Sequence, residues 1–350
     1  MSSIIDFLRR RKHRNSPALY YMKGCFSYFS PVFFAKVRLK HMLSGYTKLT
    51  KSEQEYVAGR LNYYNKLNET ISVPPTPASD GSEMVTLDKL RFGAVYNGRR
   101  SRSVYILDAH ETIKFFSPKL KAGFLFGDIT HVPMIPMFTK SRPIAGDNAN
   151  SVVLKLEKMR HFTFLKDNRK FTDKKNMLIG RAFVDQPHRR KFWEMYFGHP
   201  MCDLGNINRK VVGHPEWLVS PIPIDDHLDY KFILCLEGND VASNLKWVMS
   251  SNSLAVMPRP TYETWFMEGC LIPNVHYVEI KADYSDLEER LNYYINHPAE
   301  ASKIINQAHA YISQFFNRKR ERLIGLLVTQ KYFICTGQIP KEEKIHPHCY

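Results

Sequence analysis

The stretch FILCLEGNDVASNLKWVMSSNSLAVM (Phe232–Met257) contains two apolar runs separated by a polar loop and a helical pattern. The first run, residues 232–236, stops at Glu237-Gly238-Asn239-Asp240. Residues 243–250 have helical spacing, and the second run covers residues 254–257. Short apolar runs bounded by such signals are typical of buried parallel strands. The polar loop is either a cradle for phosphate and sugar groups or an ordinary strand-to-helix turn.

The same alternation continues on both sides of this unit. The pattern predicts strands at residues 177–183 and 275–280, and helices at residues 188–197, 262–267 and 285–296. Strands that alternate with helices at this spacing indicate a parallel sheet with helices on its faces. In such a sheet, ligands bind outside the carboxyl ends of the strands.

The chain before residue 174 predicts a first α/β unit. Residues 15–70 read mainly as helix, and residues 72–86, rich in Pro, Ser and Gly, as a loop. We interpret three short apolar runs as strands: Ser103–Asp108, Gly123–Phe126 and Val152–Leu156. Residues 298–333 have the spacing of a helix.

We therefore predict an α/β protein with two Rossmann-like domains and a long C-terminal helical segment. The predicted parts are a basic, aromatic N-terminal helical segment (1–50), a first Rossmann-like domain (51–173), a second one (174–315), and a C-terminal helix and tail (316–350).

The charge of the chain is strongly positive and uneven. Lys and Arg total 50 against 34 Asp and Glu, a net charge of +16, and residues 1–50 hold ten of the basic residues and one acid. A basic end of this kind indicates an anionic surface, either membrane headgroups, phosphorylated lipid or nucleic acid. Ile4, Ile5 and Leu8 can share one helix face beside residues 9–12, which would suit a helix on an anionic membrane. A solvated basic tail explains the same residues.

The chain lacks the signatures of several other classes. No run reaches the roughly 18 apolar residues of a membrane span. The six cysteines are scattered, so neither a zinc site nor a disulfide framework is indicated, and reduced thiols in the cytoplasm are the simplest reading. The doublet Asp225-Asp226 is poor evidence for a metal site. We predict no metal.

The polar loop carries the first group of candidate residues. Gly238 would let a ligand approach the backbone, Ser243 and Asn244 could donate to phosphate oxygens at a helix start, and Lys246 could add charge. Neither GxxxxGK[ST] nor GxGxxG is present. An ordinary turn remains the alternative.

Two further places carry candidate residues. Asp128 follows the apolar run Phe124-Leu125-Phe126, where a general base is often held, although it could equally cap the next turn. Arg181 follows a strand and Arg189 lies at a helix start, where two guanidinium groups could clamp a diphosphate. A solvated helix start is the alternative for Arg189.

Taken together, these segments resemble glycosyltransferase family 90. The run KFILCLEGNDVASNLKWVMSSNSLAVM, the segment Tyr262-Glu263-Thr264-Trp265-Phe266 and HYVEIKADYSDLEERLNYYINHP occur in the order of that family's signature. The resemblance covers about residues 120–315 and is poor over the first 100.

The resemblance implies a GT-B fold, with a donor cleft between an acceptor domain (51–173) and a nucleotide-sugar domain (174–315). It implies an inverting transfer, without a bound metal or other cofactor, from a nucleotide sugar that we expect to be a UDP-sugar. The family's base falls on Asp128, and Glu263 would hold donor hydroxyls. Its phosphate-contacting loop falls on these residues: Gly238, Asn239, Asp240, Ser243, Asn244 and Lys246.

The sequence departs from the animal branch of the family at Asn244, where those enzymes carry Arg. Lys246, Arg181 or Arg189 would then meet the diphosphate. The bacterial branch that modifies lipopolysaccharide fits better, because the lumenal signal of the animal enzymes is missing. We therefore expect a cytoplasmic protein on the inner face of the cytoplasmic membrane, acting on a lipopolysaccharide core. Two other classes stay open: a nucleic-acid-binding protein, which lacks any recognisable motif here, and a non-catalytic membrane-surface protein.

Overall fold

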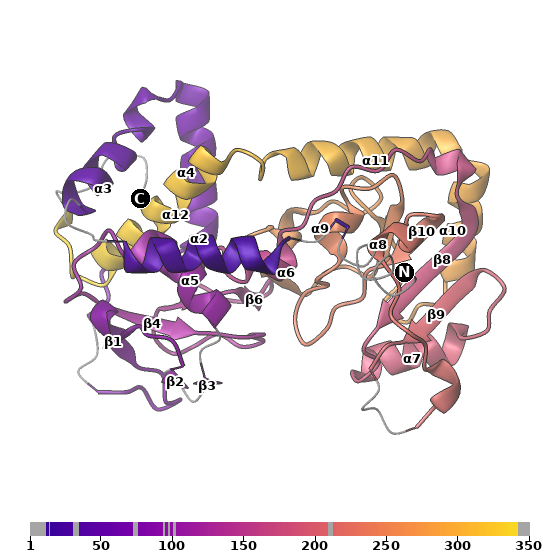
Figure 1. Cartoon of the computed structure of the whole chain (residues 1–350), viewed down its shortest axis with the longest axis horizontal. Coiled ribbons are helices and arrows are strands. Elements are labelled where there is room, and N and C mark those ends of the chain that lie inside the picture. The colour runs from indigo at the N-terminus through magenta and orange to yellow at the C-terminus, as the bar shows by residue number, and fades with distance from the viewer. Residues whose placement is uncertain are drawn as a thin grey trace. The chain divides into compact units, whose positions relative to one another are not determined.

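The computed structural model describes residues 12–13, 15–30, 35–72, 76–93, 95–96, 99–100, 103–208 and 213–341. Its residues group into two compact units (Figure 1). Unit 1 contains Met159–Pro260, Glu268–Gln314 and the described residues up to Ser16. Unit 2 contains Pro17–Lys158, Thr261–Met267 and the described residues from Phe315 onward. The domain boundaries given above stay a prediction, as does the GT-B arrangement.

Unit 1 is built on a five-stranded parallel sheet of order β13-β11-β10-β8-β9. The strands are β8 (Lys175–Ala182), β9 (Cys202–Asn206), β10 (Tyr230–Leu234), β11 (Leu254–Met257) and β13 (Val278–Glu279). Numbered along the chain, the order is that of a flavodoxin-like doubly wound sheet. The predicted parallel sheet is therefore confirmed.

Helices lie before, between and after these strands in the chain. They are α6 (Lys158–His161, at the boundary of the units), α7 (Pro187–Tyr196), α8 (Ile224–His227), α9 (Leu245–Val248), α10 (Leu287–Asn296) and α11 (Pro298–Ser313), with 3-10 turns η3 (Phe171–Asp173), η4 (Pro215–Trp217) and η5 (Glu268–Cys270). Helix α10 buries Leu287, Leu291 and Tyr294, whose spacing of four and three residues gives it one apolar face.

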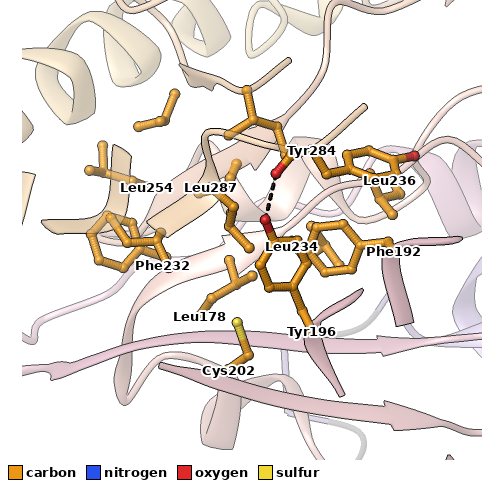
Figure 2. Close-up of a cluster of buried hydrophobic side chains, with 14 of the residues drawn as sticks. Leu178, Phe192, Tyr196, Cys202, Phe232, Leu234, Leu236, Leu254, Tyr284 and Leu287 are labelled. Carbon is orange, nitrogen blue, oxygen red and sulfur yellow. Dashed lines mark hydrogen bonds between the residues drawn. The ribbon is translucent and has the colours of Figure 1, made fainter. Parts of the chain in front are cut away.

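The core of unit 1 surrounds the central strand β10, which is buried along its whole length. Figure 2 shows Phe232 and Leu234 of β10 among side chains from both α7 and the start of α10. The hydroxyl of Tyr196 donates to the backbone oxygen of Tyr284 at 2.6 Å, so the buried polar group of this aromatic side chain is satisfied.

Unit 2 contains a four-stranded sheet of order β1-β4-β5-β7, parallel except for β1. Its strands are β1 (Met84–Thr86), β4 (Lys121–Leu125), β5 (Met137–Thr139) and β7 (Ser151–Val153). Two antiparallel pairs accompany it: β6 (Ser141–Pro143) with β12 (Tyr262–Thr264), and β2 (Val95–Tyr96) with β3 (Arg99–Arg100).

The long helices of unit 2 come from both ends of the chain. They are α2 (Pro17–Phe29), α3 (Ala35–Leu43), α4 (Lys51–Tyr64), α5 (Ser103–Ile113) and α12 (Arg318–Cys335), with 3-10 turns η1 (Tyr46–Lys48) and η2 (Leu87–Lys89). Thr50 and Glu53 form a capping box that starts α4. Among the residues described, no helix combines the length and the apolar composition required to cross a membrane.

Two predicted elements were wrong in kind. Ser103–Asp108, predicted as a strand, is the start of helix α5. Periodicity cannot separate a short apolar run from a buried helix segment, and the apolar pattern continues to Ala109 and Ile113 at helical spacing. Tyr262–Met267, predicted as a helix, contains strand β12, because Glu263 pairs across the ladder with Arg142, a partner distant in sequence.

Other elements differ in length from their prediction. The helix predicted at 243–250 is only the four-residue α9, and the helical stretch predicted at 298–333 is two helices, α11 and α12, the second capped by the side chain of Asn317. The basic amphipathic helix predicted at the N-terminus falls on residues 1–11, which lie outside the described part of the chain.

Candidate active site

The order of the strands in unit 1 indicates where a sheet of this kind binds its ligand. The chain passes from β8 to β9 on one side and then returns to the other side of β8 to form β10. At such a switch point the connections leave in opposite directions, which opens a crevice at the carboxyl ends of the two strands. Those ends are residues 183–186 after β8 and residues 235–240 after β10.

Arg189 bridges these two strand ends. It lies in the first turn of α7, which begins with Pro187 at a position suited to proline. Its Nη1 donates to the carbonyl of Phe183 at 2.9 Å, its Nη2 to that of Leu236 at 2.9 Å, and its Nε to that of Glu237 at 2.8 Å. Burial lowers the pKa of Arg189 to about 10, so the guanidinium stays charged at neutral pH.

The polar loop after β10 is packed directly against this guanidinium. A Cβ added at Gly238 would lie 3.4 Å from Nη2 of Arg189, in van der Waals contact with the cation. A ring nitrogen of His188 also bonds the carbonyl of Glu237 at 2.8 Å, and Gln186 donates to the side chain of Asn239 at 2.9 Å. The start of α7 thus fixes the loop.

The rest of the loop is held by the strand it follows. Asn244 donates from its side-chain amide to the carbonyl of Leu234 at 2.9 Å, and the amide of Gly238 donates to the carbonyl of Asp240 at 3.0 Å. Asp240 is buried, whereas Ser243 and Asn239 are exposed. Because α9 has only four residues, its N-terminus offers little dipole to an anion.

Two of the predicted cations are engaged by acids of the protein. Lys246 has no exposed surface, and its ammonium lies 2.5 Å from the carboxylate of Glu268, which is also buried. Arg181 donates to the carboxylate of Asp203 at 2.6 Å and to its backbone oxygen at 2.7 Å. Their phosphate contacts stay predictions, and a contact from the buried Lys246 would require its ion pair to open.

Asp128 lies in unit 2, just beyond the end of β4. Its side chain is 29% exposed, and its Oδ1 accepts from Nζ of the buried Lys140 at 2.5 Å. The turn before it uses Gly127 at φ +116°, a conformation open to glycine. The hydroxyl of Ser141 accepts from the amide of Ile129 at 3.1 Å, which fixes the segment that follows. The carboxylate is thus partly exposed and firmly oriented.

Sequence reasoning noted Lys140 as part of a polar loop but placed neither Lys140 nor Glu157 beside Asp128. The Lys140 ammonium lies 3.8 Å from Oε2 of Glu157, which also accepts from the hydroxyl of Tyr105 at 3.1 Å. Glu157 is buried and holds a positive φ of 55°, which is uncommon for a residue other than glycine. Asp128, Lys140 and Glu157 come from three separate segments of the chain, so their proximity could not be predicted from local sequence. The one signal for Glu157 in the sequence is that this acid follows an apolar run.

Glu263 is placed away from solvent within unit 2. Its carboxylate accepts from Nε of Arg142 at 2.8 Å and from the hydroxyl of Tyr63, and its exposed fraction is 2%. The predicted contact with donor hydroxyls stays a prediction. The ion pair of Glu263 with Arg142 joins β12 to β6.

Asp225, the first residue of the acidic doublet, forms ion pairs with basic side chains. Burial alone would raise the pKa of Asp225, but hydrogen bonds from His13, Lys12 and Arg169 lower it to about 2. Across the described residues there is no group of three or more His, Cys, Asp and Glu side chains placed to hold a metal ion. Whether the reaction uses a metal is a separate question, and metal independence stays a prediction.

Comparison with known proteins identifies the class. The family model described as "Glycosyl transferase family 90" matches residues 208–321, which include the whole loop after β10. The "O-glucosyltransferase LpsA" of Dichelobacter nodosus is 38% identical over 277 residues, covering 79% of this chain and 82% of that protein. The chain belongs to glycosyltransferase family 90, and it is a glycosyltransferase enzyme.

More distant relatives match a shorter part of the chain. "Protein O-glucosyltransferase 2" of Danio rerio is 29% identical over 108 residues, 30% of this chain and 21% of that protein. "Uncharacterized protein 027R" of Frog virus 3 is 33% identical over 116 residues, 32% of this chain and 12% of that protein. The resemblance inferred from the sequence motifs is therefore confirmed at the level of the family.

Proposed function

We propose that the protein transfers a hexose from a nucleotide sugar to a sugar hydroxyl of a lipopolysaccharide core, with inversion at the anomeric carbon and without a bound metal. The name of the Dichelobacter nodosus relative, an O-glucosyltransferase called LpsA, supports the sugar and the acceptor class. We expect UDP as the nucleotide. A GT-B arrangement of the two units is part of the proposal.

The observation that carries the proposal is the orientation of Asp128. One carboxylate oxygen accepts from the buried Lys140, which fixes the side chain, while the group keeps 29% of its surface exposed. A general base must come within hydrogen-bond distance of the hydroxyl it deprotonates. Asp128 would take the proton of the acceptor hydroxyl as that oxygen attacks the anomeric carbon from the face opposite the leaving diphosphate. A single displacement of this kind inverts the configuration.

The leaving diphosphate needs a positive and hydrogen-bonding environment. We assign this role first to Arg189, because three of its five N–H groups already fix it to carbonyls at the switch point. Its charge sits directly beside Gly238, where the absence of a side chain lets phosphate oxygens approach. Asn239 and Ser243, which are exposed in the same loop, would supply hydroxyl and amide contacts.

The decisive experiment replaces Asp128→Asn. The amide cannot accept the proton, so turnover should fall by a factor on the order of 10² or more, while donor binding stays unchanged. Asp88→Asn, at an exposed position of the same unit, serves as the control. Near-normal turnover of the Asp128 variant would show that another group is the base.

A thermal-shift screen with UDP-, GDP-, CMP- and ADP-sugars should identify the nucleotide. Stabilisation by the UDP-sugars alone is the expected result, because a ligand that binds the folded state raises the unfolding temperature. The anomeric configuration of the product, read by nuclear magnetic resonance, tests inversion. A product that retains the donor's configuration would exclude the single displacement.

We also propose that the protein acts at the inner face of the cytoplasmic membrane, where a core acceptor is assembled. Residues 1–50 carry ten basic residues and one acid, and anionic lipid attracts such segments by about 1 kcal/mol for each Lys or Arg near the surface. Docking through this segment would bring the enzyme to an acceptor anchored in lipid.

A further inference from the structure

Helix α2 has one face that is fixed against the rest of unit 2. The hydroxyl of Tyr20 donates to the carboxylate of Asp108 in α5 at 2.6 Å and also to the backbone oxygen of Val104. A Cβ added at Gly24 would lie 2.7 Å from a methyl carbon of Leu107, so the missing side chain allows the two helices to approach closely. Figure 1 shows α2 running alongside α5.

The C-terminal half of α2 is fixed on the same side. Lys114, which follows α5, donates from its ammonium to the hydroxyl of Ser27 at 2.7 Å and to its backbone oxygen at 3.0 Å. Tyr20, Gly24 and Ser27 are spaced by four and three residues, so they lie on one face of the helix. The orientation of α2 about its own axis is therefore determined.

The opposite face of α2 consists of large apolar side chains that the fold leaves in solvent. They are spaced by three, four and three residues, which places them in one stripe. The exposed fractions are 55% for Leu19, 65% for Met22, 80% for Phe26 and 74% for Phe29. Contiguous exposed apolar groups of this size mark interaction surfaces in soluble proteins.

Positive charge gathers near the C-terminal half of α2, where the ammonium of Lys114 donates to Ser27. Burial lowers the pKa of Lys114, and the charges of Arg322 and Arg38 lower it further. Burial and the charge of Arg38 likewise lower the pKa of Arg322. The three cations are thus close enough to repel one another, with Glu111 as an acid whose charge opposes this effect. Lys23 of α2 is exposed as well. The cations thus lie on α2 itself, at Lys23, and where its C-terminal half meets the end of α5.

We propose that the outward face of α2 lies in the headgroup region of an anionic lipid bilayer, with Met22, Phe26 and Phe29 inserted and the neighbouring cations at the phosphates. An apolar stripe with basic residues beside it is the pattern of an interfacial helix, which inserts about 5–10 Å into the boundary of headgroups and acyl chains. The inference rests on the proposed function in one respect, namely that the acceptor is anchored in lipid.

The size of the stripe favours lipid over a protein partner. With about 200 Å² for a large side chain, the four residues expose on the order of 500 Å². A standard protein interface buries about 800 Å² on each partner. A bilayer needs no matching surface, and anionic headgroups complement the flanking charge.

The test is co-sedimentation of the full-length chain with phosphatidylcholine vesicles, with and without phosphatidylglycerol. The variant Met22→Ser/Phe26→Ser/Phe29→Ser should bind the anionic vesicles about 100-fold more weakly than the parent. The control Met134→Ser/Ile272→Ser/Phe316→Ser removes side chains that are 60%, 54% and 52% exposed on other parts of the surface, and it should bind like the parent.

The charged part of the surface is tested separately. Arg38→Ser should weaken binding to the anionic vesicles several-fold and leave binding to pure phosphatidylcholine unchanged, because only anionic headgroups attract the cation. If the triple variant does not fold, Phe26→Ser alone, at the most exposed of the four positions, gives the same comparison with Ile272→Ser as its control.

Several results would overturn the inference. They are absence of vesicle binding by the parent chain, equal binding by the parent and the α2 variant, equal loss in the control, and a parent chain whose self-association the α2 variant abolishes. Turnover with a water-soluble acceptor separates this inference from the proposed function. The α2 variant should keep that turnover, and a parent chain without it would refute the transferase reaction but not the vesicle result.

Discussion

The ion pair between Lys246 and Glu268 gives the sharpest prediction, because sequence and structure assign this lysine different tasks. The sequence motif places Lys246 at the donor phosphates. The structure gives it no exposed surface and places its ammonium 2.5 Å from a carboxylate that is 1% exposed. We expect Lys246 to maintain the segment below the loop, and the loop itself to meet the ligand.

The magnitude follows from the burial of both charges. Replacing Lys246→Met leaves the Glu268 carboxylate in a site that excludes water, and removal of one partner from a buried pair costs about 3–5 kcal/mol. In a domain of 150–250 residues, 1 kcal/mol changes the unfolding temperature by about 2–4 °C. The unfolding temperature of the single variant should therefore be about 6–20 °C below that of the parent. The double variant Lys246→Met/Glu268→Leu should recover most of this loss, because apolar replacement of a buried pair is often neutral.

The assay is a double-mutant cycle in which denaturant unfolding gives the coupling free energy and steady-state kinetics give the donor KM. We expect a coupling of about 3 kcal/mol. We also expect the double variant to keep the donor KM of the parent. A stable double variant whose donor KM rises tenfold or more would refute this reasoning, because it would show that the ammonium contacts the donor.

Three further predictions follow from other contacts. Arg189→Lys removes the forked donors that hold the carbonyls of the switch point, so its KM for the donor should rise about tenfold. The control variant Arg190→Lys, at the exposed neighbouring position, should keep the KM of the parent. Burial and the charge of Lys114 lower the pKa of His110 to about 4 from 6.5. As the pH decreases, His110 is therefore protonated in the unfolded chain before it is protonated in the folded one. The free energy of unfolding should fall between pH 6.5 and pH 4, and it should fall less in the variant His110→Gln. Replacing Arg9, Arg10 and Arg11 with Ser should weaken binding to anionic vesicles at low salt, and equal binding would remove the docking role of that segment.

The sequence predicted most of unit 1 because its strands are short apolar runs with clear boundaries. The run at residues 254–257 coincides with β11, and the predicted helix at 188–197 coincides with α7 within one residue. Local pattern failed in unit 2, where α5 was taken for a strand and β12 for a helix. The apolar run at the start of α5 is ambiguous between strand and helix, whereas β12 depends on a distant residue, Arg142 opposite Glu263. A single sequence holds no record of such pairs.

The candidate site was predictable to a different extent. The motifs identified the loop after β10 and the carboxylate after β4, since both follow buried strands. The partners of those residues were not predictable: Lys140 beside Asp128, and the carbonyls beneath Arg189. The identity of a charged residue in a motif does not show whether that residue binds a ligand or another side chain of the protein. Burial in the folded chain makes the distinction.

Burial and existing partners rank the candidate residues by how available each side chain is to a ligand. Lys246 and Glu263 are almost fully buried and held by opposite charges, so a ligand would have to displace a strong interaction to reach them. Asp128 is oriented through one carboxylate oxygen and keeps exposed surface. The guanidinium of Arg189 hydrogen-bonds to three neutral carbonyls, with Asp185 as an acid whose charge also acts on it. A transition state that develops negative charge gains most from a cation of this kind. Arg189 and Asp128 are therefore the two residues on which the chemistry should depend most.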